Sequence, residues 1–233
     1  MAIAETATAI VKKKAEIKNT PRRKLLPLER MFREIGTVQA THKMSKKQFL
    51  KFSQKHGDLQ MERESDGTVI IMPLVLGGSG KREAKIIAYL GMWQMQSEMG
   101  EVYGSTTGFD LPDGSTRAPD AAWISDERLA DMSPEEEENN FIPVVPDFVV
   151  ELRSSSDRLA KMKNKMKDIW MKNGVRLGWL IDPYKEKVYI YREDGSSDIV
   201  EGFSGNILSG EDIMPGFELP LEKLKLKKKK KGK

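Results

Sequence analysis

The stretch Pro146-Asp-Phe-Val-Val-Glu151-Leu-Arg-Ser154 is the most informative part of the chain, because it reads as a short buried strand that ends on a carboxylate. An earlier stretch, Arg117-Ala-Pro-Asp120-Ala-Ala-Trp-Ile124, starts a second apolar run with a carboxylate. Burying a carboxylate costs free energy unless a cation or a hydrogen-bond donor pairs with it. We therefore expect Asp120 and Glu151 to have partners, although solvent exposure or simple pairing with arginine explains the pattern equally well.

The segment that follows, residues 157–172, has the spacing of an amphipathic helix. At about 100° per residue, its apolar side chains fall in one arc made of Leu159, Met162, Met166, Ile169 and Trp170. Lys165 lies on one border of this arc and Lys163 on the other. A lysine at such a border either covers apolar surface with its stem or holds its ammonium group over the carboxylates of the preceding strand. The periodicity does not choose between Lys165 and Lys163.

The composition restricts the chemistry. The 233 residues are enough for one well-buried core. There is no cysteine, so thiolate metal sites and thiol nucleophiles are excluded, and the two histidines, His42 and His56, argue against a histidine-based site. The remaining groups for catalysis are those of Asp, Glu and Lys. Two carboxylates and a lysine can gather a divalent cation and a developing negative charge, which is the chemistry of phosphodiester hydrolysis.

The net charge of +4 is unevenly distributed along the chain. Residues 1–30 carry +5 and residues 222–233 carry +7, which leaves −8 for residues 31–221. Lysine runs of this kind are usually solvated ends, and attraction to nucleic acid is the alternative. No apolar run is long enough to cross a membrane, and the N-terminus lacks the features of a secretory signal. We therefore expect no membrane association and a cytoplasmic location.

The patterning predicts three parts: a flexible basic extension over residues 1–40, one α+β domain over residues 41–221 and a lysine-rich tail over residues 222–233, with both ends disordered. The domain should have a central mixed β-sheet flanked by helices. Helices are predicted from the Ser45 capping box to about Gly57, over 81–99 and over 157–172. Strands are predicted within 62–72 (as a hairpin), 101–110, 118–125, 148–152, 178–183 and 187–192, and 207–221 is the last ordered segment.

The glycine-rich segment Gly77-Gly-Ser-Gly-Lys81 invites comparison with a phosphate-binding loop. That pattern requires a glycine five positions before Gly80 and a serine or threonine after Lys81, but Val75 and Arg82 stand there. We predict a plain flexible loop.

Several short motifs occur together between Phe49 and Phe217. They are Glu62 ahead of Asp66-Gly67, Ser105-Thr-Thr-Gly-Phe109, Leu111-Pro-Asp-Gly114, the two carboxylate stretches quoted above, Asp157-Arg-Leu159, Lys165-Met, and Gly174-Val-Arg-Leu-Gly-Trp-Leu-Ile-Asp-Pro183. Each motif is weak alone, but the combination resembles the Uma-two family of restriction endonucleases, which is placed in the PD-(D/E)XK nuclease superfamily.

This resemblance implies a restriction-endonuclease-like core and a metal-dependent endonuclease that acts on DNA. It implies that Asp120 and Glu151 are ligands of Mg²⁺ or Mn²⁺, and that Glu62 adds an acidic group near the metal. The superfamily's Glu-x-Lys motif is altered, because Arg153 stands two residues after Glu151. In the family the lysine is displaced to the following helix, which matches Lys165. The catalytic set implied is therefore Asp120, Glu151 and Lys165.

The alternative is a non-catalytic nucleic-acid-binding protein that keeps the nuclease fold and holds nucleic acid with its basic tails. Convergence of Asp120, Glu151 and Lys165 in one pocket would favour the enzyme, whereas their dispersal would favour the binding protein. The sequence leaves open the DNA sequence or strand preference, the choice between the two ions, and the oligomeric state, with a homodimer among the candidates.

Overall fold

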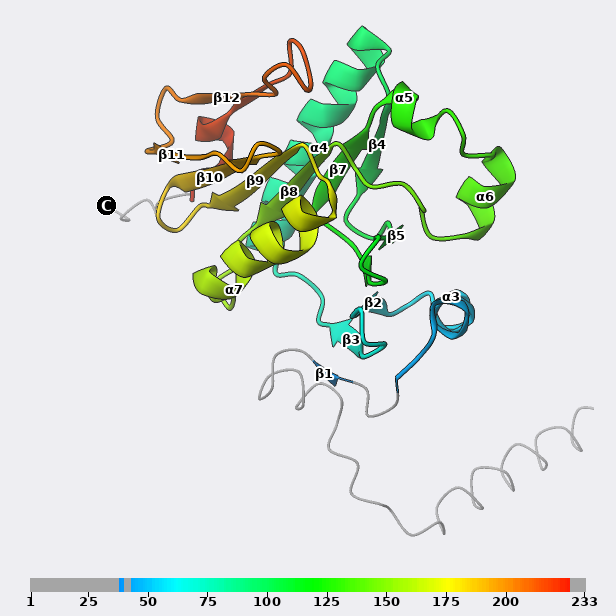
Figure 1. The fold of residues 1–233 in the computed structure, drawn as a ribbon. Coiled ribbons are helices and arrows are strands. Elements are labelled where there is room, and N and C mark those ends of the chain that lie inside the picture. The colour runs from blue at the N-terminus through cyan, green and yellow to red at the C-terminus, as the bar shows by residue number, and fades with distance from the viewer. Residues whose placement is uncertain (1–37, 40–42, 227–233) are drawn as a thin grey trace, which may run out of the picture. The chain divides into compact units, whose positions relative to one another are not determined.

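The structure is a computed structural model that describes residues 38–39 and 43–226 (Figure 1). The described residues belong to one compact unit. The predictions of a flexible extension over 1–40 and of a disordered lysine-rich tail over 222–233 fall largely on residues outside this range. In the described part of the chain, no helix is long and apolar enough to cross a membrane.

Six strands form the central sheet, in the order β11-β10-β9-β8-β7-β4. The pair β8–β9 is parallel and the other neighbouring pairs are antiparallel. This mixed sheet confirms the predicted fold class. The bounds are Glu101–Gly104 (β4), Ala121–Ile124 (β7), Phe148–Leu152 (β8), Leu177–Asp182 (β9), Lys187–Arg192 (β10) and Ser197–Glu201 (β11).

A second, antiparallel sheet has the strand order β1-β3-β2-β6-β5. Its strands are Val38–Gln39 (β1), Gln60–Arg63 (β2), Val69–Met72 (β3), Phe109–Asp110 (β5) and Thr116–Arg117 (β6). Near the C-terminus, Ile207–Ser209 (β12) pairs with Glu218–Pro220 (β13).

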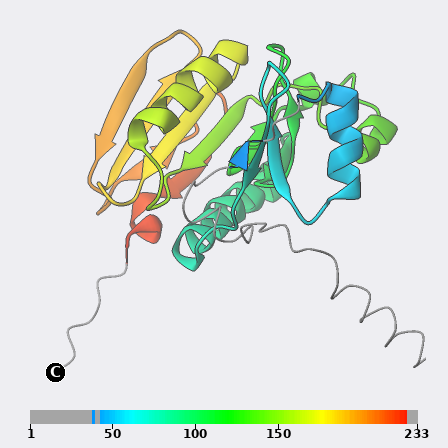
Figure 2. The ribbon, with the colours of Figure 1, turned by 90° about the horizontal axis from the view of Figure 1, so that it is seen from below.

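Two helical segments cover opposite faces of the central sheet (Figures 1 and 2). One is α4 (Gly77–Ser97). The other runs without interruption through α7 (Leu159–Asn164), the π-helical turn η2 (Lys165–Trp170) and the 3₁₀ turn η3 (Met171–Asn173). The remaining helices are α3 (Lys46–Lys55), α5 (Asp126–Leu129), α6 (Pro134–Asn139) and the 3₁₀ turn η4 (Leu221–Leu224).

Local signals in the sequence explain several of these elements. The predicted capping box is present at α3, where the Ser45 hydroxyl accepts from the backbone N–H of Gln48 and the Gln48 side chain accepts from the backbone N–H of Ser45. The hairpin predicted within 62–72 forms from β2 and β3. Gly67 lies at its turn with a φ of 92°, a conformation that favours glycine.

The loop predicted at Gly77–Gly80 is wrong, because these residues form the first turn of α4. Glycine is a poor helix former, so local propensity gave no sign of a helix. Tertiary contacts stabilise the turn instead. The Arg82 guanidinium donates from Nη1 to the carbonyl of Gly78 at 2.6 Å and from Nε to the carbonyl of Leu224 at 2.8 Å.

Other boundaries also differ from those expected. The single strand expected over 101–110 is two short strands, β4 and β5, which belong to different sheets. The strand β11 was not predicted. The packed core continues past residue 221, since Leu224 in η4 is fully buried.

Candidate active site

Glu151 lies in β8, whose side chains alternate between the two faces of the central sheet. Phe148 and Val150 pack toward α4, whereas Val149 packs toward the opposite helical segment. Glu151 therefore points to the same face as Val149. Its side chain is buried, with 5% of the residue exposed, and it meets the helical segment at η2.

Asp120 immediately precedes β7, which pairs with β8. The register places Ala121 opposite Val150, so one residue further along Asp120 lies across from Glu151. Backbone hydrogen bonds hold it there. The Asp120 N–H donates to the carbonyl of Val150 at 3.0 Å, and the Leu152 N–H donates to Asp120 Oδ2. The two carboxylates predicted from the sequence are therefore neighbours on adjacent strands.

Lys165 begins the π-helical turn η2 and reaches these strands. Its Nζ lies 2.8 Å from Glu151 Oε1 and 3.0 Å from Glu62 Oε1. Lys163 points elsewhere, with its Nζ 3.8 Å from the centroid of the Tyr189 ring. The geometry thus places Lys165, and not Lys163, with the carboxylates.

Glu62, from the second sheet, completes a cluster with Asp120, Glu151 and Lys165. It lies in β2 and is 4% exposed. Its Oε1 accepts from Lys165 Nζ and from the Ala118 N–H at 3.3 Å, while its Oε2 accepts from Arg117 Nη1 at 3.1 Å. Arg117 also forms an ion pair with Glu64. Both oxygens of Glu62 are therefore engaged by protein donors, and its predicted contact with a metal ion stays a prediction.

The charged groups of the cluster shift one another's pKa values. Burial raises the pKa of Asp120, and the negative charge of Glu151 raises it further. Burial also raises the pKa of Glu62, but Lys165 and Arg117 outweigh it, so this pKa lies below its ordinary value. For Lys165, burial lowers the pKa, but Glu151 and Glu62 outweigh that effect and leave the pKa above its ordinary value. Lys165 is therefore an ammonium ion at neutral pH.

The donor set fits a hard divalent cation. Asp120 and Glu151 offer carboxylate oxygens side by side, and a cation between them would relieve their mutual repulsion. Within residues 38–39 and 43–226, no group of three or more His, Cys, Asp or Glu side chains is arranged to hold a metal ion. Mg²⁺ commonly binds through one or two carboxylates and keeps several waters. The Asp120–Glu151 pair therefore suits such an ion without Glu62 as a third ligand.

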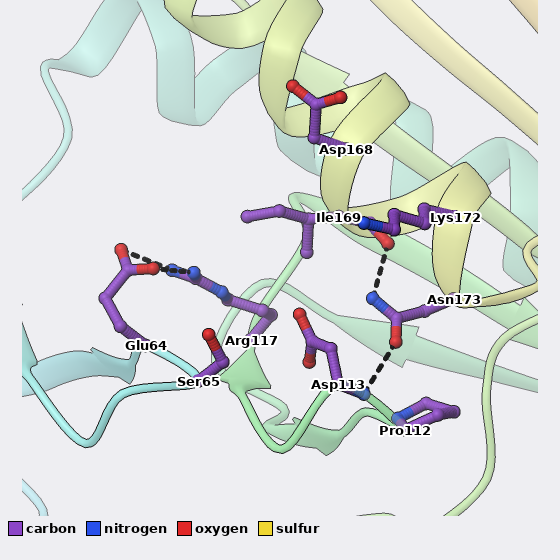
Figure 3. A pocket seen from close by; sticks show the side chains of 9 residues that line it. All are labelled: Glu64, Ser65, Pro112, Asp113, Arg117, Asp168, Ile169, Lys172 and Asn173. Atoms are coloured by element: carbon purple, nitrogen blue, oxygen red, sulfur yellow. Dashed lines mark hydrogen bonds and ion pairs between the residues drawn. The ribbon is translucent and has the colours of Figure 1, made fainter.

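A cavity of about 530 Å³ is lined in part by Arg117 (Figure 3), but Asp120, Glu151, Lys165 and Glu62 are not among its lining residues. Figure 3 shows the helical segment on one side of it and the loop around Asp113 on the other. Asn173 links the two sides, because its side-chain oxygen accepts from the Asp113 N–H at 2.9 Å and its amide donates to the Ile169 carbonyl at 2.8 Å. The lining residues are Glu64, Ser65, Pro112, Asp113, Arg117, Asp168, Ile169, Lys172 and Asn173.

Three residues of the site were not predicted from the sequence. The indole N–H of Trp170 donates to Glu151 Oε1 at 2.7 Å. Arg117 binds Glu62, and the charge of Glu83 on α4 adds to the raised pKa of Asp120. The signal for Trp170 was available, since a buried indole N–H usually needs an acceptor. Arg117 contacts a distant segment and the charge of Glu83 acts on Asp120 from a distant segment, and periodicity reveals neither.

The chain combines a mixed α+β fold with paired carboxylates on neighbouring strands and a lysine from the following helix. A family model, Uma2, described as "Putative restriction endonuclease", matches residues 47–222, and the chain belongs to this family. The match confirms the resemblance recognised in the motifs.

A solved structure shows the same fold. It is a protein from Anabaena variabilis ATCC 29413, described as a putative nuclease belonging to DUF820. The two share 18% sequence identity with a TM-score of 0.63, over 78% of this chain and 97% of that chain. No curated protein matches the chain.

Proposed function

We propose that the protein is an endonuclease that hydrolyses DNA phosphodiester bonds with Mg²⁺ or Mn²⁺. The observation that carries the proposal is the meeting of Asp120, Glu151 and Lys165 at the start of β7 and the end of β8. Membership of the Uma2 family supports the same activity. A protein that only bound nucleic acid would have no need to gather a buried Glu151, a half-buried Asp120 and Lys165 at one point, so the same convergence favours the enzyme over that alternative.

Each residue has a proposed role. Asp120 and Glu151 would hold the cation through their carboxylate oxygens, and the bound cation supplies Lewis acidity that polarises the scissile phosphate and lowers the pKa of water. The ammonium group of Lys165 would stabilise the negative charge that develops on the phosphate. Glu62 keeps the lysine near the strands through its 3.0 Å ion pair. Arg117 in turn holds Glu62.

The charge distribution supports separate roles for the ends and the body of the chain in DNA binding. The body of the chain, residues 31–221, carries −8 and repels a polyanion, whereas residues 1–30 and 222–233 carry +5 and +7. We propose that the basic ends attract DNA and that the cation makes the acidic site compatible with phosphate. The cytoplasmic location and the homodimer stay predictions.

A cleavage assay tests the proposal. Supercoiled, linear and single-stranded DNA would be incubated with Mg²⁺, with Mn²⁺ or with EDTA. We expect cleavage of at least one substrate with metal and none with EDTA, and we expect Glu151→Gln to lose it. Binding of DNA without cleavage under all of these conditions would support the non-catalytic alternative.

Thermal unfolding tests the location of the cation independently of DNA. A ligand that binds the folded state raises the melting temperature, so Mg²⁺ should stabilise the wild type. Asp120→Asn should abolish this response. A full response in the variant would mean that the cation binds elsewhere.

A further inference from the structure

Trp170 is fully buried, and its indole N–H donates to Glu151 Oε1 at 2.7 Å. The same oxygen lies 2.8 Å from Lys165 Nζ. One oxygen of the proposed metal-binding carboxylate therefore accepts from two donors of the same helical segment. One of these donors is charged and the other is neutral.

The π-helical turn brings these two donors together. Lys165 and Trp170 are its first and last residues. In an α-helix, residues five apart are separated by about 140° around the axis, because each residue turns by about 100°. The hydrogen bonds of a π-helix join residues five apart, so their side chains come to the same side. Such turns are often found at functional sites.

The packing beneath the turn supports this arrangement. A Cβ at Gly178 in β9 would collide with Met166 Cε and would lie 3.2 Å from Met171 Sδ. The absence of a side chain at Gly178 leaves room for the ends of these two methionine side chains between the helical segment and β9.

We propose that Trp170 is a positioning residue for Glu151. Its indole N–H fixes Oε1 and leaves Oε2 for the cation shared with Asp120. The inference rests on the proposed function, because the orientation of Glu151 matters to catalysis only if this carboxylate binds the metal.

A neutral donor suits this role for two reasons. First, it orients the carboxylate without the repulsion that a second positive charge would exert on the cation. Second, when Lys165 turns toward the phosphate, Glu151 Oε1 keeps Trp170 as a donor. Partners that orient metal ligands in this way commonly contribute 10- to 100-fold, as an order of magnitude, to metal affinity.

The affinity for Mn²⁺, measured on the full chain without DNA by calorimetry, tests the role. Trp170→Phe keeps an aromatic ring and removes the N–H, so we expect about tenfold weaker binding. Trp93→Phe is the matched control. Trp93 lies on α4, and its indole N–H donates at 3.1 Å to the carbonyl of Pro215, outside the site. This control should bind Mn²⁺ as the wild type does.

The recovery of cleavage by excess Mn²⁺ is a second measurement, and it would not occur if Trp170 had a purely structural role. If Trp170 acts through the metal ligand, saturating Mn²⁺ should restore most of the cleavage lost in Trp170→Phe. Failure of excess Mn²⁺ to restore cleavage would contradict the proposed role.

Indole NMR signals test the contact without changing Trp170. The chain has four tryptophans and therefore four indole N–H signals. Glu151→Gln, without metal, should shift the signal of the indole that donates to this side chain. Adding Mg²⁺ to the wild type should shift the same signal.

The outcomes separate the two proposals. Unchanged Mn²⁺ affinity in Trp170→Phe, or an Mg²⁺ titration that does not move the signal sensitive to Glu151→Gln, would overturn the positioning role and leave the proposed function standing. A wild type that binds no Mn²⁺ would overturn the proposed function itself, and the role of Trp170 with it.

Discussion

Single residues in the cluster differ in how well their charge is compensated. Glu62 is paired with Lys165 and Arg117, and Glu151 is paired with Lys165. Asp120 instead accepts a hydrogen bond from the backbone N–H of Leu152. A buried charge without an ionic partner destabilises a fold. Asp120 is therefore the residue whose charge most needs a cation.

The first prediction concerns the pH dependence of Asp120→Asn. Because burial and Glu151 raise the pKa of Asp120 in the folded protein, ionising this group costs stability. The free energy of unfolding of the metal-free wild type should therefore fall as the pH rises from 3.8, the ordinary pKa of Asp, through the raised pKa of Asp120 in the folded protein. The variant should therefore be more stable than the wild type at pH 7, with a difference that shrinks toward pH 4. Urea unfolding in EDTA would measure it.

Asp113→Asn is a control in which the change in stability at pH 7 should have the opposite sign. Burial raises the pKa of Asp113, but hydrogen bonds from Ser115 outweigh it and leave the pKa lowered. This variant should be less stable than the wild type at pH 7, and the difference should shrink as the pH falls. The same trend in both variants would contradict the assignment of the Asp120 charge.

The second prediction concerns Arg117, which is 4% exposed and pairs with both Glu62 and Glu64. Arg117→Met would leave a buried carboxylate without one of its partners. We expect a loss of about 3–5 kcal/mol in the free energy of unfolding, measured in urea at neutral pH. The exposed pair Lys43–Asp66 provides the control, since Lys43→Met should change stability far less. Equal effects would mean that the Arg117 network is not buried in solution.

At the scale of elements, most of the fold could be predicted because the signals are local. The capping box at Ser45, the turn at Gly67 and the alternation of β10 all specify their elements directly. The start of α4 and the π-helical turn could not be predicted. The first depends on the contacts of Arg82 with Gly78 and Leu224, and the second differs from an α-helix only in its hydrogen-bond register.

The third prediction tests the connection between α4 and β4. Gly100 has a φ of 58°, and a Cβ there would collide with the carbonyl oxygen of Ile124. Gly100→Ala should therefore lower the free energy of unfolding by about 2–4 kcal/mol. Gly57→Ala is the matched control, because nothing lies within 4 Å of a Cβ at Gly57. If the free energies of unfolding of the two variants differ by less than about 1 kcal/mol, the backbone around residue 100 must shift to make room for the Cβ.

At the scale of the whole molecule, the sequence indicated the candidate carboxylates and the candidate lysine but not how they meet. Asp120 and Glu151 could be found because each lies at one end of an apolar run. The meeting of Glu62 with Lys165 could not, since it joins two sheets. The periodicity left Lys163 and Lys165 equal. The family resemblance indicated Lys165, and the packing of η2 on β8 places its ammonium group beside Glu151.

The fourth prediction concerns the basic C-terminus. Leu224 is buried in the core, so a deletion that tests charge alone should begin at residue 227. Removing residues 227–233, which include six lysines, should weaken DNA binding uniformly across sequences. The log–log salt slope should flatten by about 0.9 for each DNA phosphate that a lysine no longer neutralises. Turnover at saturating DNA should be retained. An unchanged slope would mean that these lysines do not bind DNA.

The cleavage rates of a matched pair of lysine variants test most directly whether Lys165 acts with Asp120 and Glu151 in catalysis. Lys165 and Lys163 are two residues apart on one helical segment, but the Nζ of Lys165 contacts Glu151 whereas that of Lys163 lies over the Tyr189 ring. With saturating metal and DNA, Lys165→Met should slow cleavage by about 10²–10³-fold, and Lys163→Met should cleave at close to the wild-type rate. Equal rates in the two variants, or a larger loss in Lys163→Met, would contradict the proposed active site.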